Sequence, residues 1–259
     1  MPAPAPFAPD AVIRRVDSEA VVLLGGGRAL LMQVAHPMVA RAVSEHSKFE
    51  ANPYARLQRT LGAVYTVVFG TTEQAERAAR AIGRVHEGVT GPEYRADDPA
   101  LLLWVHATLV DTALYMQECF LSPLDAELGA QYYQEATLVG EAFGVPRDQQ
   151  PPDLDAFRAY VATMVERLAA GLTDDSRRVA KAVLHPRLPA ALRPVMAVAR
   201  ELSTGLLPVG LRDGFDLRWT PRRQAALDAL AWSGRAVLPH VPAVVRRVPT
   251  GRIIRASGY

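Results

Sequence analysis

The stretch TTEQAERAARAIGRVHEGVT, residues Thr71–Thr90, has the pattern of one amphipathic helix with a histidine near its end. Thr71 followed by Gln74 predicts a capping box, and Gly88 marks the stop. Apolar residues recur at three- and four-residue spacing, which predicts that His86 lies on the apolar stripe. Because an unsatisfied buried polar group costs on the order of 1–3 kcal/mol, such an imidazole needs a partner. That partner is either another protein group or an iron ion. The other members of the stripe are Ala75, Ala78, Ala79, Ile82, Val85 and Val89.

Composition narrows the class of protein. The chain has 259 residues, of which 49% are hydrophobic, so it can bury a full core. A formal net charge of +2 gives no field that favours nucleic acid. The single cysteine, Cys119, excludes an intrachain disulfide framework and cysteine-rich zinc motifs. The proline- and alanine-rich opening lacks the pattern of a signal peptide, and we expect a cytoplasmic protein without membrane insertion. The oligomeric state is left open.

Helical periodicity dominates the whole chain, and no alternating strand or hairpin pattern is convincing. We therefore expect an all-α, single-domain helical bundle over residues 17–245. Residues 1–16 are expected to be a disordered arm, and residues 246–259 a basic tail that is solvated rather than a binding patch. Asp17 or Ser18 is expected to cap the first helix. The expected helices are 19–24, 28–44, 53–69, 71–90, 99–120, 125–143, 153–170, 174–184, 190–203 (interrupted by Pro194) and 220–237.

Several familiar site motifs fail on spacing. His86-Glu87 begins like a zinc-protease helix, but Thr90 stands where the second ligand is needed. No histidine has a glutamate three residues before it, which excludes the Glu-x-x-His pattern of carboxylate-bridged di-iron bundles. The Gly25-Gly26-Gly27 run lacks the Lys-Ser/Thr of a phosphate loop, so it indicates a flexible break or close helix packing. The Gly-x-Ser-x-Gly nucleophile elbow does not occur.

Other polar residues stand within apolar stretches. His36 precedes Pro37, which predicts a kink or restart of the helix, either purely structural or as the wall of a pocket. Arg56 and Thr60 are one turn apart on the same helical face. The guanidinium either extends to solvent or a carboxylate, or binds a cofactor propionate or an oxygen species. His106 lies deep in an apolar helix, where it is either a hydrogen-bonded core histidine or a ligand.

Taken in order, a set of short segments resembles a known family. They resemble the catalytic domain shared by rubber oxygenases (latex clearing proteins) and the MpaB-type oxygenase of mycophenolic acid biosynthesis. The resemblance covers roughly residues 22–165. The segments are Gln33-Val34-Ala35-His36-Pro37, Glu45-His46-Ser47-Lys48-Phe49, Arg56-Leu57-Gln58-Arg59-Thr60, Val68-Phe69-Gly70, Val85-His86-Glu87-Gly88-Val89-Thr90-Gly91, Asp98-Pro99, Trp104-Val105-His106-Ala107-Thr108 and Tyr132-Tyr133-Gln134-Glu135.

The resemblance implies an all-helical protein that holds haem b, with His86 as the proximal iron ligand. It places Arg56 and Thr60 on the distal side as catalytic residues. Where rubber oxygenases have a lysine that closes the distal position, this chain has Arg59, a poor metal ligand because it keeps its proton. The distal position is then open, water-bound, or held by His36 or His46.

The implied activity is a haem-dependent oxidation by O2 or peroxide, such as cleavage of a carbon–carbon double bond. The expected substrate is a hydrophobic, unsaturated small molecule rather than polymeric rubber. His36 is a further catalytic candidate, and Arg59, His46 and His106 are further candidates for contact with the cofactor. The alternatives are a haem-binding sensor or carrier without turnover and a haem-free helical scaffold.

Overall fold

The computed structural model describes residues 4–46, 53–186 and 193–258, and for residues 53–58 it describes the backbone alone. Helices make up almost all of the regular structure in these ranges, which confirms the all-α class. The helices of the N-terminal half are α1 (Val12–Asp17), α2 (Ala20–Leu24), α3 (Gly26–Ala35), α4 (Pro37–His46), α5 (Pro53–Phe69), α6 (Thr72–Glu87) and α7 (Pro99–Phe120). Those that follow are α8 (Ala126–Ala142), η1 (Arg147–Gln149), α9 (Leu154–Ala170), α10 (Asp174–Leu184), α11 (Arg193–Gly205), α12 (Val209–Gly214), α13 (Pro221–Val237), η3 (Leu238–His240), α14 (Ala243–Arg246) and α15 (Thr250–Ser257).

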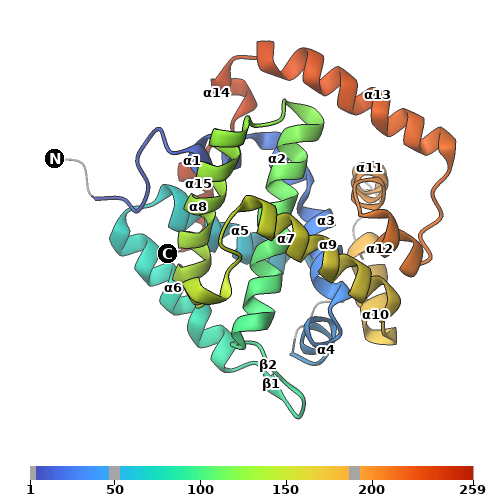
Figure 1. The fold of residues 1–259 in the computed structure, drawn as a ribbon, viewed down its shortest axis with the longest axis horizontal. Coiled ribbons are helices and arrows are strands. Elements are labelled where there is room, and N and C mark those ends of the chain that lie inside the picture. The colour runs from blue at the N-terminus through green and yellow to red at the C-terminus, as the bar shows by residue number, and fades with distance from the viewer. Residues whose placement is uncertain (1–3, 47–52, 187–192, 259) are drawn as a thin grey trace.

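Helix α7 is the centre of the fold (Figure 1). Asp98 caps it by accepting from the backbone N–H of Ala100 at 2.8 Å, and Pro99 occupies the first turn as expected. The helix packs against α1, α2, α3, α8, α9 and α13. Its length and composition would also allow it to cross a membrane, but 56% of its apolar window is buried inside the protein. A helix that is apolar nearly all round is expected at the core of a bundle.

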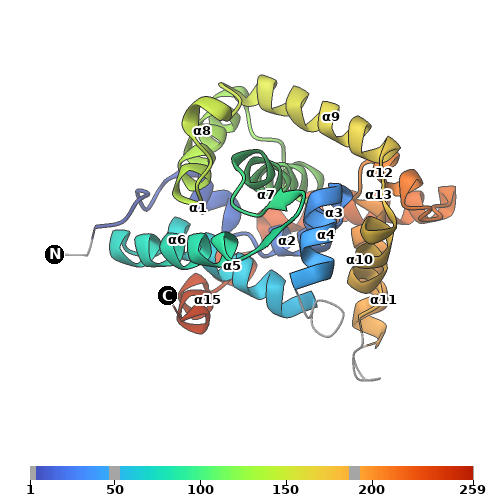
Figure 2. The ribbon, with the colours of Figure 1, turned by 90° about the horizontal axis from the view of Figure 1, so that it is seen from below.

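The remaining helices form two groups beside α7 (Figures 1 and 2). On one side lie α1, α5, α6, α8 and α15, and on the other side lie α3, α4 and α10–α12. Helix α9 spans between α8 and α12, and α13 runs along the outside of α7 and α11. The space between α7 and the first group is where the cavity described below lies.

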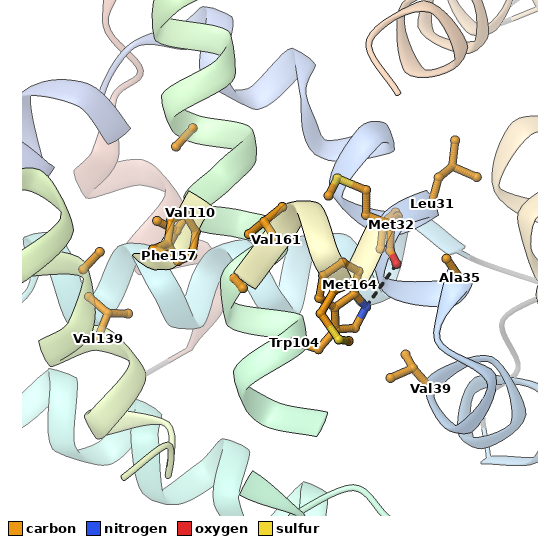
Figure 3. Close-up of a cluster of buried hydrophobic side chains, with 14 of the residues drawn as sticks. Leu31, Met32, Ala35, Val39, Trp104, Val110, Val139, Phe157, Val161 and Met164 are labelled. Carbon is orange, nitrogen blue, oxygen red and sulfur yellow. Dashed lines mark hydrogen bonds between the residues drawn. The ribbon is translucent and has the colours of Figure 1, made fainter. Parts of the chain in front are cut away.

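The main core lies around Trp104 of α7, whose side chain is fully buried (Figure 3). Its indole N–H donates to the carbonyl oxygen of Met32 on α3 at 3.1 Å, so the one polar atom of the ring is satisfied. Phe157 and Met164 of α9 pack into the same cluster. Contacts among α3, α7 and α9 thus fix the position of the central helix.

A buried arginine joins α3 to α7 and to the segment after α11. Arg28 is 4% exposed, and its guanidinium lies 2.8 Å from a carboxylate oxygen of Asp111. It also donates to the Thr112 hydroxyl at 2.7 Å and to the Leu206 carbonyl at 2.8 Å. The nearby glycines allow close packing, because a Cβ at Gly25 would come within 2.5 Å of the Thr112 methyl. Close helix packing, one of the two expected readings of the triple glycine, is confirmed.

Local signals in the sequence predicted the helix ends well. The capping box is present, since the Thr71 hydroxyl accepts from the Gln74 N–H and the Gln74 side chain accepts from the Thr71 N–H. His36 has an extended backbone with ψ of 122°, and a new helix starts at Pro37, which confirms the expected restart. Pro194 lies within α11, whose described residues begin at Arg193, and the expected helix start at residue 190 lies outside the described residues.

The structure corrects several expectations at the start of the chain and after α6. Part of the expected arm is folded, because α1 begins at Val12 and Phe7 is buried. Asp17 is the last residue of α1 and not an N-cap, and the N-cap of α2 is Glu19, which was expected to be the first helical residue. A short antiparallel hairpin, β1 (Thr90–Gly91) and β2 (Tyr94–Arg95), follows α6 where no strand was expected.

The expected basic tail is packed in part, although Arg247, Arg252 and Arg255 are exposed to solvent as expected. Helix α15 lies against α5, and Arg246 reaches the buried carboxylate of Glu19 with 2.7 Å between Nε and Oε2. The Val248 N–H donates to the Ser18 carbonyl at 2.8 Å. Burying Glu19, which is 3% exposed, requires a cation, and the tail supplies it.

Candidate functional site

A cavity lies between α7 and the helices α1, α2, α3, α5 and α8. It contains about 720 Å³ of space not filled by atoms, a volume that includes its opening to solvent. Most of its walls are aliphatic, for example Leu61, Val64, Leu109 and Val139. The polar side chains that line it are Asp17, Thr60, Tyr65, His106, Thr112 and Tyr132. The cavity therefore suits an apolar molecule with few polar atoms.

Asp17 carries the carboxyl group of this cavity. Its Oδ1 accepts a hydrogen bond from the Tyr132 hydroxyl at 3.1 Å. The Tyr65 hydroxyl donates to the backbone carbonyl of Asp17 at 2.6 Å, which fixes the end of α1. In the described part of the chain, no cation pairs with Asp17. Burial raises the pKa of Asp17 to about 7, the Tyr132 hydrogen bond acts against this rise, and the charge of Glu135 adds to it.

His106 is the imidazole of the cavity. It projects from α7 toward α8, where a Cβ on Gly140 would come within 3.0 Å of its ring. Burial lowers the pKa of His106 to about 4, and a backbone hydrogen bond to Ala136 opposes that shift only in part. The ring is therefore neutral near pH 7, and a neutral imidazole carries one nitrogen lone pair that accepts a proton or binds a metal.

Of the predicted site residues, Thr60 and His106 line the cavity. The side chain of Arg56 lies outside the described residues, and Arg59 is exposed to solvent. His36, His46 and His86 do not belong to the lining of this cavity. The structure thus brings two of the predicted residues together and places three histidines elsewhere.

Two of these histidines, His46 and His86, lie toward the β1–β2 hairpin, and His36 lies between α3 and α4. His46 is exposed, and its Nε2 lies 3.0 Å from the carbonyl oxygen of Thr90. His86, on the last turn of α6, is half-buried and helps to lower the pKa of Asp97. His36 has a buried Nδ1 with no hydrogen-bond partner in the described residues, and burial lowers its pKa, with a smaller contribution from Arg167.

The apolar stripe of α6 ends earlier than the sequence predicted. Ala75 and Ala78 are buried, but Val85 is 60% exposed. The last turn of α6 extends past the core toward the hairpin, so its side chains pack against fewer residues of the other helices. His86 is therefore at the boundary of the core, with an interaction of its own, and not deep within it.

Sequence reasoning missed the carboxyl group and both tyrosines of the cavity. Asp17 was assigned to a helix cap, and Tyr132 entered only as part of a family segment. One signal was available, since Ile13 and Val16 share the apolar pattern of α1 and point that helix into the core. The contact partner was not available, because Asp17 and Tyr132 are 115 residues apart in the chain.

Fold and cavity together define an all-α protein with an apolar chamber at its centre. Comparison with known proteins identifies the class further. The chain belongs to the family described as ER-bound oxygenase mpaB/B'/Rubber oxygenase, catalytic domain, which it matches over residues 13–236. It is 29% identical over 216 residues to the uncharacterized proteins Mb2261 of Mycobacterium bovis and Rv2237 of Mycobacterium tuberculosis. Each match covers 78% of this chain and 82% of the relative. No solved structure matches the chain.

Proposed function

We propose that this chain is a haem b-dependent oxygenase that oxidises a hydrophobic, unsaturated small molecule with O2 or peroxide, with His86 as the proximal iron ligand. The observation that carries the proposal is an aliphatic cavity at the centre of an oxygenase catalytic domain. Oxidative cleavage of a carbon–carbon double bond is the reaction that the resemblance favours. A cytoplasmic location without nucleic-acid partners is part of the same proposal.

The donor set suits haem better than a bare metal ion. A non-haem iron site is built from about three protein ligands, whereas haem iron needs only one or two axial ligands from the protein. Among the described residues, no three His, Cys, Asp or Glu side chains gather so that they could hold a metal ion. Separate imidazoles such as His86 and His106 meet the requirement for an axial ligand. When bound, the haem would supply activation of the oxidant.

His86 and the cavity are linked through helix α5. Only Gly70 and Thr71 separate α5 from α6, and the two helices pack together, so the end of α6 lies on the side where α5 begins (Figure 2). Thr60 lies further along α5 and lines the cavity. A site that runs along α5 from His86 to Thr60 would therefore open into the cavity. His106 is the second candidate ligand, because its neutral ring lies in the cavity itself.

The residues of the chain would then have distinct tasks. Thr60 presents a hydroxyl that donates a hydrogen bond to an oxygen atom of the oxidant or substrate. The aliphatic walls around Leu61 and Val139 hold the hydrocarbon part of the substrate and exclude water. From its sequence position one turn before Thr60, Arg56 would add a fixed positive charge.

The absorption spectrum of the purified protein tests the haem proposal. Protein produced with a supply of haem should show a Soret band, and His86→Ala should abolish it while helical circular dichroism persists. His106→Ala should keep the band, and His240→Ala, at an exposed position on η3, is the matched control. Loss of the band only in His106→Ala would move the ligand assignment to α7. A wild-type protein without the band would overturn the proposal in favour of a haem-free scaffold.

Turnover separates the oxygenase from a haem carrier or sensor. With a candidate alkene, the wild-type protein should consume O2, or form a carbonyl product that depends on peroxide. Thr60→Val removes the hydroxyl while keeping the shape of the side chain, and it should lower the rate at least tenfold. The reason is that a hydrogen bond that is stronger in the transition state than in the bound substrate lowers the activation free energy. A haem-loaded protein without any turnover would be a carrier or sensor.

A further inference from the structure

The carboxyl group of Asp17 is the least expected feature of the cavity. A charged or titratable group in an aliphatic wall is costly unless it has a partner. Tyr132 satisfies one oxygen, Oδ1, and the Tyr65 hydroxyl goes to the backbone and not to the carboxyl. In the described residues, no hydrogen bond to Oδ2 is found, and Oδ2 is not among the buried polar atoms without a partner, so it is accessible to a ligand at a residue that lines the cavity. One oxygen of the carboxyl group is thus held and the other is free.

We infer that Asp17 is the polar anchor of the cavity and that its free oxygen, Oδ2, donates a hydrogen bond to a neutral carbonyl or hydroxyl oxygen of an otherwise apolar ligand. This inference deepens the proposed function by naming the polar end of the substrate. It does not depend on haem, because the binding site comprises the side chains of the cavity alone.

The surroundings of Asp17 favour the protonated, donating form. From α8, Tyr132 and Glu135 face it, from α5 Tyr65 does so, and His106 of α7 lines the same cavity. None of these groups carries a positive charge near pH 7, since burial keeps His106 neutral. The nearest arginine in sequence that is partly buried, Arg14, donates to the Phe7 carbonyl instead. With a pKa of about 7, the Asp17 carboxyl is protonated in mildly acidic solution and ionised in alkaline solution.

This protonation also defines the ligand class. A protonated carboxyl group donates to a carbonyl oxygen, while an ionised one has nothing to donate and repels other anions. A ketone, aldehyde or alcohol with a hydrocarbon body therefore fits the cavity, whereas a fatty acid carboxylate would find no cation among the described lining residues. The aliphatic walls hold the body, and the geometry at Oδ2 orients the head group.

Binding of 2-decanone tests the inference, because this ketone accepts hydrogen bonds but cannot donate them. Calorimetry on the purified full chain, in the haem state in which it is isolated, should give an affinity that falls about 30-fold between pH 5.5 and pH 8.5. This factor follows from the protonated fraction of a group with a pKa of about 7. Asp17→Asn keeps the shape and a permanent N–H donor, so its affinity should be independent of pH. An affinity independent of pH in the wild type, the same pH dependence in Asp17→Asn, or no binding overturns the inference.

Two further variants shift the pH midpoint in opposite directions, which a merely structural role would not do. Tyr132→Phe removes the hydrogen bond that lowers the pKa of Asp17, so the midpoint should rise. Glu135→Gln removes the charge that raises that pKa, so the midpoint should fall, while its amide oxygen still accepts from the Ile13 N–H. A Soret band that is absent with these results intact would overturn the haem proposal alone. Unshifted midpoints with a normal Soret band would overturn the anchor alone.

Discussion

The central cavity and the hairpin end of the molecule place similar side chains in opposite surroundings. Here the hairpin end means β1, β2 and the adjoining ends of α4, α6 and α7. At the hairpin end, Arg95 hydrogen-bonds to Asp97 and holds the pKa of that carboxyl below its usual value. In the cavity, Asp17 has no cation, and burial raises its pKa to about 7. The same residue type is an anion near neutral pH in one region and, below about pH 7, a neutral proton donor in the other.

The histidines differ in the same way. His46 at the hairpin end is exposed and lies against a backbone carbonyl. His106 lines the cavity, and its pKa of about 4 means that it stays neutral down to about pH 4. In the cavity, burial without an opposite charge shifts the pKa values of Asp17 and His106 toward their neutral forms. At the hairpin end, solvent and an ion pair keep Asp97 in its charged form. Perturbed pKa values of this kind mark candidate functional sites, which is why the cavity is the better place to look for the substrate.

Filling the cavity should have the largest effect. Ala136 is 1% exposed and lines the cavity, so Ala136→Phe should abolish both turnover of an alkene and binding of 2-decanone. The matched control is Val85→Phe at the hairpin end, where the side chain is exposed and the added ring meets solvent. Calorimetry and oxygen consumption measure the two outcomes. An equal loss in both variants would show that the cavity has no special role.

Replacing the buried carboxyl should change how stability depends on pH. The pKa of Asp17 is raised on folding, from about 3.9 in the unfolded chain to about 7, so unfolding releases a proton between these values. Its contribution to stability is thus present at low pH and is lost as pH rises toward 7. Asp17→Asn should gain stability over wild type by roughly 3–4 kcal/mol between pH 4 and pH 8. Urea unfolding across pH measures this, and a constant difference would contradict the shifted pKa.

The buried imidazole should act with the opposite sign. The pKa of His106 is lowered on folding, so its contribution is present above pH 6.5 and is lost as pH falls toward 4. His106→Leu should remove this loss, worth roughly 3 kcal/mol between pH 7 and pH 4. Asp17 and His106 oppose each other between about pH 4 and 6.5, so each single variant uncovers a slope that the wild type hides. His240→Leu is the control. If the unfolding free energies of His106→Leu and His240→Leu had the same slope against pH, His106 would not be enclosed.

The ion pairs of the hairpin end should matter least. Arg95 is exposed and Asp97 is partly exposed, and the attraction within such a pair is screened by salt and offset by the loss of side-chain freedom. Asp97→Asn should leave the urea midpoint within error at 0.5 M salt, and 2-decanone binding unchanged at any salt concentration. A large loss of 2-decanone binding would place the substrate site at the hairpin end, beside His86, and a large fall in the urea midpoint would show that the ion pair stabilises the fold.

Much of the fold could be predicted because helix ends are local. Thr71 with Gln74 and Asp98 with Pro99 are capping signals within four residues, and Pro37 restricts the residue before it. The candidate site could be predicted only in part. Thr60 was found through a family segment, and His106 through its place in an apolar helix. Asp17 was assigned to a helix cap, because a short polar residue before an apolar run is equally consistent with an N-cap and with a residue that lines a site.

The sequence by itself determined the helices, their capping residues, the restart at Pro37 and membership of the oxygenase family, because these depend on hydrogen bonds and residue types close together in the chain. The tertiary structure alone decided that Asp17 meets Tyr132, that Glu19 needs the arginines of the C-terminal segment, and that His106 lines the cavity while His86 does not. Such contacts join residues a hundred or more positions apart. Their energies come from burial and charge, which exist only once the helices have packed.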